Sequence, residues 1–431
     1  MIFLAAAAAA IAVDGASAPR GVAPTLPDFA PRVAIEPIDA VVFGGNALPF
    51  AAFVTGGQFG KQQPVRWQVV GPGSIASNGL FVAPIGVDSA IIAAGVDGTA
   101  SAVDVAIARP PPDQPLVLIS CYEGDAVDVR DPADFRRLGE VQAGPLASGI
   151  AVDASRRTAF VAARERVFGL DLARMTAIAS APIAGARFSG VAALAGGLYA
   201  ATDNNAAAGA PGVRLFRIDS FGAPLLVGSV AAGETPEGIV ASADGSTFFV
   251  TNVNSGELMR FDVRGGTALL RSRVPTGTRP FGVALDERHG LLFVADNDTP
   301  VISGNRSRPG LEIFLTRTLQ RIGAPIVTGS PNSLPIGVAV DTGTSRLFVT
   351  NEGDDDVVVY ALPSMRRLAV LPTGRAPWAP RIDPLRHRLY VPGARSDSVD
   401  VYDTRSLHRI GARIKTCQYP TSLGLVERKA H

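Results

Sequence analysis

Short apolar runs, separated by turns rich in Gly, Asp and Asn, fill the chain from residue 116 to the C-terminus. From Gly149 onward one unit recurs: a small residue or Gly, three or four apolar residues, Asp, a polar turn, and an aromatic-rich run ending in Asn or Asp. Two further runs follow in each copy, most clearly 357–360 and 367–371. The runs consist of Val, Ile, Leu, Phe and Tyr and show no 3.6-residue period, so the pattern predicts β-strands and not helices.

The copies of this unit start about 40 to 55 residues apart, which with four strands each is typical of a β-propeller blade. The last copy, 421–426, stops after one strand, whereas 116–121 has the pattern of a second strand with no first strand before it. Joining these two segments completes a blade and leaves no open sheet edge. The sequence therefore predicts an all-β fold with a seven-bladed β-propeller over 116–431, closed by the C-terminal strand. Its equivalent positions are Gly149, Gly190, Gly238, Gly282, Gly337, Ala379 and Ser422.

The chain has two cysteines, Cys121 and Cys417, whose separation excludes a CxxC redox or zinc motif. Cys417 precedes the first strand of the composite blade and Cys121 ends its second strand. Because neighbouring antiparallel strands place the start of one beside the end of the other, both cysteines are predicted on the same face. This predicts a disulfide that fastens the ring; the alternative is two unpaired thiols.

The repeat units resemble the YVTN-type β-propeller repeat family, through GVAVDTGTSRLFVTN at Gly337 to Asn351 and through weaker copies elsewhere. The resemblance covers roughly residues 115–427. It implies a propeller fold and a protein that is exported or held at the cell surface. It implies no particular activity, because one fold supports many functions.

Residues 31–108 lack the repeat and alternate in short strands around Trp67, which predicts a β-sandwich. The stretch VRWQVVGPGSIASNGLFVAP, 65–84, resembles the bacterial Ig-like domains of surface proteins, and such a module is expected to be a spacer or an adhesive unit. Residues 109–115, rich in proline, are predicted to form a stiff linker.

The N-terminal segment 1–18 is read as a signal peptide: an Ala-rich apolar run is followed by the small residues Ala16, Ser17 and Ala18. The run is too short to span a bilayer, so no transmembrane anchor is expected. Export to the periplasm, cell surface or medium follows as a prediction. The formal net charge of +1 argues against a nucleic-acid partner.

Polar side chains at strand ends are predicted to surround the channel on the top face of the propeller, where the loops between strands two and three lie. Carboxylate and amide oxygens that converge there could bind Ca²⁺, as in gluconolactonase-type propellers; otherwise no cofactor is expected. The alternative is that the Asn side chains cap turns. The predicted ligand-binding residues are Arg164, Asp203, Asn204, Glu237, Asn252, Asp296, Asn351 and Arg395, and the candidate metal ligands are Glu237, Asn252, Asp296 and Asn351.

Four histidines occur, and the pattern places none of them at the predicted channel mouth. A Ser-His-Asp triad is therefore hard to build, and no GxSxG motif is present. The interpretation leans toward a non-catalytic binding protein whose top face meets a small molecule, a cell-surface component or a protein. The alternative is a metal-dependent, lactonase-like hydrolase.

Overall fold

The structure, a computed structural model, describes residues 32–38, 40–55, 64–96, 99–111, 113–206, 210, 212–298 and 310–427. The segment read as a signal peptide, 1–18, lies outside these residues. The regular structure that is described is almost entirely β-strand, with the short 3-10 helices η1 (Ala195–Gly197) and η2 (Ala394–Ser396). None of the described helices has the length and apolar character needed to cross a bilayer.

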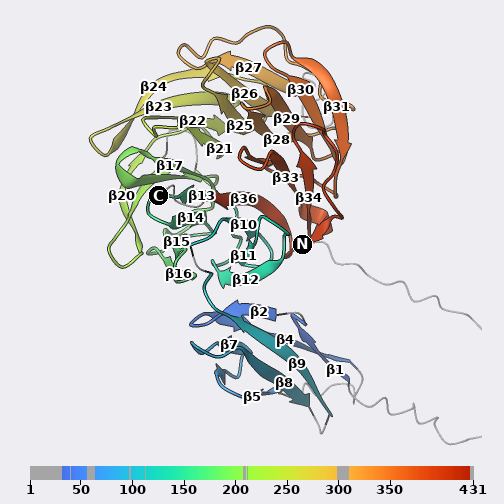
Figure 1. The fold of residues 1–431 in the computed structure, drawn as a ribbon. Coiled ribbons are helices and arrows are strands. Elements are labelled where there is room, and N and C mark those ends of the chain that lie inside the picture. The colour runs from blue at the N-terminus through green and yellow to red at the C-terminus, as the bar shows by residue number, and fades with distance from the viewer. Residues whose placement is uncertain are drawn as a thin grey trace, which may run out of the picture.

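Residues from 116 onward form small antiparallel sheets arranged in a ring (Figure 1), so the predicted all-β class is confirmed. In each complete sheet the strands pair in sequence order, as the repeat predicted. The four-stranded sheets are β13 (Ile150–Asp153), β14 (Thr158–Ala162), β15 (Val167–Asp171) and β16 (Thr176–Ala179); β17 (Phe188–Leu194), β18 (Leu198–Asp203), β19 (Val213–Ile218) and β20 (Pro224–Val230); β21 (Pro236–Ala241), β22 (Thr247–Asn252), β23 (Glu257–Arg264) and β24 (Thr267–Pro275); β28 (Pro335–Asp341), β29 (Arg346–Asn351), β30 (Asp356–Ala361) and β31 (Arg366–Pro372); and β32 (Arg381–Asp383), β33 (Arg388–Gly393), β34 (Ser398–Asp403) and β35 (Ile414–Lys415).

One sheet departs from the expected four strands. It contains β25 (Pro280–Asp286), β26 (Leu291–Asp296) and β27 (Gly310–Leu315). In place of a described fourth strand, single bridges join Leu311 to Ile326 and Phe314 to Arg321. The fourth run of this copy, with Pro325 and Gly323 within it, is too interrupted to sustain a ladder.

The remaining sheet of the ring joins the two ends of the repeat array. Strand β36 (Pro420–Val426) pairs with β10 (Leu116–Cys121), which continues into β11 (Ala126–Arg130) and β12 (Arg137–Gln142). The predicted disulfide is present: Cys121 and Cys417, which are 296 positions apart in the sequence, are bonded with their Cα atoms 5.7 Å apart. The chain ends are thus joined by a strand pair and by a covalent bond.

The first strands of neighbouring sheets approach one another closely around the axis. At five repeat glycines, an added Cβ would lie only 2.2 to 2.7 Å from a backbone carbonyl oxygen of the next sheet. At Gly238, for example, that oxygen belongs to Phe281 at 2.2 Å. A side chain at any of these five positions would have to push two strands apart, so glycine is required there, whereas the two remaining equivalent positions are Ala379 and Ser422.

At this crossing, a hydroxyl group on the second strand hydrogen-bonds to the backbones of both first strands. In β22, Thr251 accepts a bond from the Gly238 N–H at 3.0 Å and donates to the Phe281 carbonyl oxygen at 2.5 Å. One buried side chain thus connects two strands of its own sheet to the next sheet. The same bridging position is taken by Thr202, Thr350 and Ser120.

The N-terminal residues form a separate module whose buried apolar side chains make one core. Its last strand leads through the predicted linker into β10. The module contains the pair β1 (Arg32–Glu36) and β4 (Ala51–Thr55); the strands β2 (Ala40–Phe43), β9 (Thr99–Ala108), β8 (Ser89–Val96) and β5 (Arg66–Val70); and the strands β3 (Ala47–Pro49), β7 (Leu80–Val82) and β6 (Ser74–Ile75).

The module also contacts the ring directly. Val42 of β2 pairs in parallel with Glu140 of β12, and the Phe43 side chain is fully buried in the core of the closing sheet. The sequence has one apolar run over 48–54, which the structure divides at Phe50 into β3 and β4. There the backbone N–H donates to the Gly79 carbonyl at 2.9 Å while the chain passes from one sheet to another.

We expect Gly238→Ala to lower the free energy of unfolding by about 1 to 3 kcal/mol, because its Cβ would overlap the Phe281 carbonyl. Gly228→Ala is the matched control, because the nearest atom to its Cβ would be a Leu215 methyl carbon at 3.8 Å. Urea unfolding of both variants would measure the difference. Equal stability of the two variants would contradict the close-approach argument.

Candidate functional site

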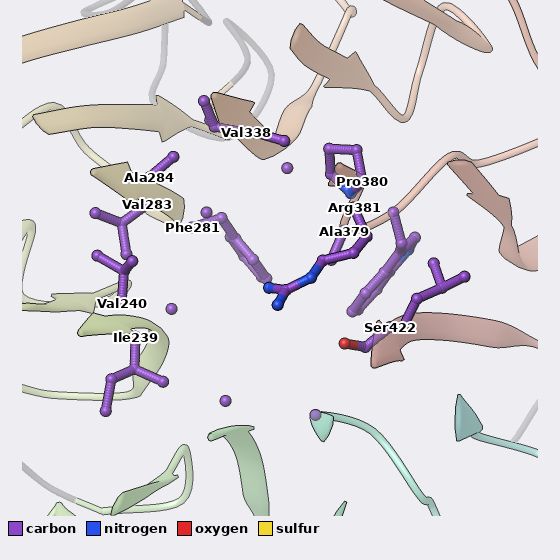
Figure 2. A pocket seen from close by; sticks show the side chains of 18 of the residues that line it. Ile239, Val240, Phe281, Val283, Ala284, Val338, Ala379, Pro380, Arg381 and Ser422 are labelled. Atoms are coloured by element: carbon purple, nitrogen blue, oxygen red, sulfur yellow. The ribbon is translucent and has the colours of Figure 1, made fainter. Parts of the chain in front are cut away.

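A cavity of about 520 Å³ lies on the axis of the ring, lined by the first strands of its sheets. The walls are largely Gly, Ala, Val and Ile, since the repeat places small and branched residues there. Figure 2 shows these side chains surrounding the open space from several strands. The volume is in the range of small-molecule sites in proteins.

One layer of the cavity is formed by the residue that precedes the repeat glycine in each first strand, and we call it the mouth ring. Because neighbouring first strands contact in chain order, the ring divides into a polar arc and an apolar arc. Such a two-sided lining suits a ligand with one polar and one apolar edge. The polar arc is Thr421, Ser148, Ser189 and Glu237, and the apolar arc is Phe281, Ile336 and Trp378.

Glu237 is the carboxylate of the mouth ring. One of its oxygens accepts a hydrogen bond from the Ser189 hydroxyl, and the other accepts one from Asn204 Nδ2 at 2.9 Å. Burial raises the pKa of Glu237, and the two hydrogen bonds and nearby Arg187 offset part of this effect. A carboxylate that is fixed by two donors and has a raised pKa is suited to accept a proton.

The second charged group that distinguishes the cavity is Arg381 of β32. In Figure 2 its guanidinium extends into the open space toward Phe281. The side chain remains accessible to water on the cavity side, yet the surrounding protein desolvates it and thereby lowers its pKa. Sequence reasoning missed Arg381, although a signal existed: the equivalent position in other copies is a small residue, as at Ala284 and Ala339.

Aromatic side chains extend the apolar arc toward the disulfide. Trp378 packs edge-on against Tyr419 with ring centroids 6.3 Å apart, and Tyr419 lies 5.7 Å from Tyr122. The Tyr122 hydroxyl accepts a bond from Arg187 at 2.6 Å. Because Tyr122 follows Cys121 directly, the disulfide helps to hold these rings beside the cavity.

Of the eight ligand-binding residues predicted from the sequence, Glu237 lines the cavity, and Asn204 donates a hydrogen bond to the Glu237 carboxylate. Asp203 instead accepts a bond from the Arg187 backbone N–H at 2.9 Å, so it stabilises a turn. Arg395 lies 3.9 Å from a carboxylate oxygen of Glu352, and the Arg164 side chain is exposed. The structure therefore brings together only part of the predicted set.

The amide groups of the candidate metal ligands have protein partners. Asn252 Oδ1 accepts from the Gly233 N–H and Asn351 Oδ1 accepts from the Thr328 hydroxyl, both at 2.9 Å. Within the described part of the chain, no group of three or more His, Cys, Asp or Glu residues is placed to hold a metal ion. These two contacts join each amide to the loop that precedes the first strand of its sheet, and the Ca²⁺ site stays a prediction.

Asp296, the remaining candidate ligand, belongs to a buried acidic pair with Glu312 of β27. Burial raises the pKa of Asp296 to about 6 and that of Glu312 to about 7. The Asp296 side chain accepts from the Arg279 backbone N–H at 2.8 Å, and Glu312 lies 3.3 Å from Arg321. These contacts lie within and beside one sheet, and neither carboxylate lines the axial cavity.

The acidic pair should make stability depend on pH. Between about pH 4 and pH 7 the folded protein retains protons on Asp296 and Glu312 that the unfolded chain has released. The free energy of unfolding should therefore fall as pH rises through this interval. Glu312→Gln should flatten the slope measured by denaturant unfolding at several pH values, whereas Glu234→Gln, at an exposed position, should not. Identical slopes in all three proteins would contradict the assignment.

The chain matches no protein-family profile and no curated protein. Its fold is similar to solved structures. A protein from Lactobacillus plantarum aligns with a TM-score of 0.60 at 15% identity, covering 73% of this chain and 100% of that one. The periplasmic gluconolactonase of Pseudomonas aeruginosa aligns with a TM-score of 0.58 at 16% identity, covering 73% and 99%. A Bacteroides uniformis protein bearing the name 6-phosphogluconolactonase gives 0.59 at 15%, covering 73% and 100%.

These comparisons correct the functional interpretation drawn from the sequence. A non-catalytic binding protein was the favoured interpretation, and it rested on the repeat, the expected export signal and the absence of histidines at the channel mouth. The similar structures include proteins named as lactonases, which favours the hydrolase alternative. The lack of histidine at the mouth does not exclude proton transfer, because a carboxylate with a raised pKa, such as Glu237, is suited to accept a proton.

Proposed function

We propose that this protein is a lactonase-type hydrolase whose substrate binds in the axial cavity. The observation that carries the proposal is Glu237, a carboxylate with a raised pKa, held by Ser189 and Asn204 in the lining of the axial cavity. Two of the similar structures described above carry lactonase names, which agrees with this chemistry. A lactone, with a polar ester edge and an apolar ring face, also suits the two arcs of the mouth ring.

In the proposed reaction, Glu237 accepts a proton from a water molecule as the water oxygen attacks the lactone carbonyl carbon. The tetrahedral intermediate then collapses, and the bond between the carbonyl carbon and the ring oxygen breaks. The ring oxygen leaves as a hydroxyl after taking the proton back from Glu237. Ser189 and Asn204 keep the carboxylate in one orientation throughout, which removes the need to reorganise it during the reaction.

No step in this scheme passes through a metal ion. The oxygens that would have to bind Ca²⁺ at Asn252 and Asn351 already accept hydrogen bonds from the protein. The proposed reaction therefore gives calcium no role, and whether activity depends on Ca²⁺ is tested by experiment.

We also propose the finer architecture that the sequence predicted: a seven-bladed propeller, preceded by an Ig-like spacer, in an exported protein. The chain-order contacts of the first strands and the pairing of β36 with β10 support the blade count. The single core shared by the strands of the N-terminal module supports the sandwich. The disulfide supports export, because disulfides persist in oxidising compartments.

The purified protein should release acid from glucono-δ-lactone faster than the spontaneous reaction, as measured by pH-stat titration. Glu237→Gln should lower kcat/KM by about 100- to 10,000-fold, because the amide cannot accept the proton. Wild-type kcat/KM should fall as pH drops through the raised pKa of Glu237. Glu234→Gln, an exposed neighbour in the sequence, is the control and should keep full activity.

Full activity in Glu237→Gln would show that Glu237 is not the proton acceptor. If the wild-type protein hydrolyses none of a panel of lactones, the hydrolase proposal itself is contradicted. The same assay after EDTA treatment addresses calcium. We expect activity to survive. If activity is lost after EDTA treatment and recovered when Ca²⁺ is added, the result would support the predicted metal site at Glu237, Asn252, Asp296 and Asn351.

A further inference from the structure

Arg381 introduces a charge into a layer of the cavity that is otherwise apolar. It belongs to β32, and the matching positions of the other first strands carry small or apolar residues. Of the equivalent residues, Val240, Ala284 and Ala339 line the cavity, and Figure 2 shows the arginine side chain extending into it. The equivalent positions are Ala151, Ala192, Val240, Ala284, Ala339 and Gly424.

The Arg381 guanidinium has no protein counter-ion. No hydrogen bond or ion pair joins it to any residue in the described part of the chain, and the only influence on its pKa is burial, which lowers it. Arginine nevertheless stays protonated in proteins. Because the side chain is exposed on the cavity side, its N–H donors are available to an anion that enters the cavity.

The other charged residues that line the cavity do not neutralise it. Glu237 is held by Ser189 and Asn204. One oxygen of Asp341 accepts bonds from the backbone N–H groups of Gly343 and Thr344, at 2.9 and 3.3 Å. An anionic ligand that enters the cavity can therefore bind Arg381 without displacing a protein carboxylate from it.

The site favours a carboxylate over a phosphate. A guanidinium can bind two oxygens of either group through parallel N–H donors, so the difference between the two lies in their charge. The single positive charge of Arg381 balances the one negative charge of a carboxylate. A phosphate dianion would retain one negative charge, and the described cavity lining has no second cation to balance it. The volume of about 520 Å³ leaves room for a small ring beside the charged group.

We propose that Arg381 binds a free carboxylate of the ligand, so that the substrate class is a lactone carrying a separate carboxylate group. The lactone part of this statement rests on the proposed function. The carboxylate site does not, because it follows from the unpaired guanidinium and the cavity around it.

Binding can be tested without turnover, using three stable sugars that differ at one carbon: glucuronate, glucose and glucose 6-phosphate. In ligand-observed NMR titrations of the full chain, glucuronate should bind wild type more tightly than either of the others. Arg381→Met should weaken glucuronate binding about 10- to 100-fold and leave glucose binding unchanged. Arg366→Met, at an exposed position on β31, should change neither.

Tighter binding of glucose 6-phosphate than of glucuronate, dependent on Arg381, would overturn the assignment to a carboxylate. Equal binding of glucuronate and glucose to wild type, or an equal loss of both in Arg381→Met, would overturn the anion site. Hydrolysis provides a separate measurement, in which glucaro-1,4-lactone should be preferred over glucono-1,4-lactone. If neither lactone is hydrolysed while glucuronate binding still depends on Arg381, the hydrolase fails and the carboxylate site stands.

Discussion

The close approach of neighbouring first strands around the axis is the constraint on which the rest of the ring depends. The absent Cβ at positions such as Gly238 lets a carbonyl of the next sheet lie at the position that a side chain would occupy. A hydroxyl such as that of Thr251 then bonds to both strands at the crossing. Because the contact is backbone to backbone, the sheets pack at nearly the same distance whatever side chains stand beside the glycine. That freedom lets the residue before each glycine vary, and the mouth ring is made of those variable residues.

The candidate site therefore arises from departures from the repeat. Most copies place small or apolar residues in the cavity, which gives it a largely apolar wall. Glu237 stands where other copies have Ser, Phe, Ile, Trp or Thr, and Arg381 stands where they have Ala, Val or Gly. Both charges are desolvated by the same wall, so burial raises the pKa of Glu237 and lowers that of Arg381. An apolar enclosure strengthens the electrostatic effect of each group on whatever binds between them.

Closure of the ring and placement of the aromatic side chains are linked at the disulfide. Strand β36 supplies the first strand that the N-terminal trio lacks, and Cys121 and Cys417 fasten that pairing. The residues beside the two cysteines, Tyr122 and Tyr419, pack against each other and against Trp378 at the edge of the cavity. The N-terminal module reinforces the same sheet by inserting Phe43 into its core. Closure thus both stabilises the ring and shapes one side of the site.

The order of the strands, the pairing of the chain ends and the disulfide could be read from the sequence, because a repeat fixes which segments occupy equivalent places. The division at Phe50 could not, since a continuous apolar run does not reveal where the chain changes sheets. The residues of the site were only partly predicted. Asn252 and Asn351 were correctly located at strand ends, but only the tertiary structure showed that their amide oxygens bond to loops about 20 residues earlier in the chain. Arg381 became significant only in three dimensions, because whether a guanidinium is paired depends on neighbours that come from every part of the ring.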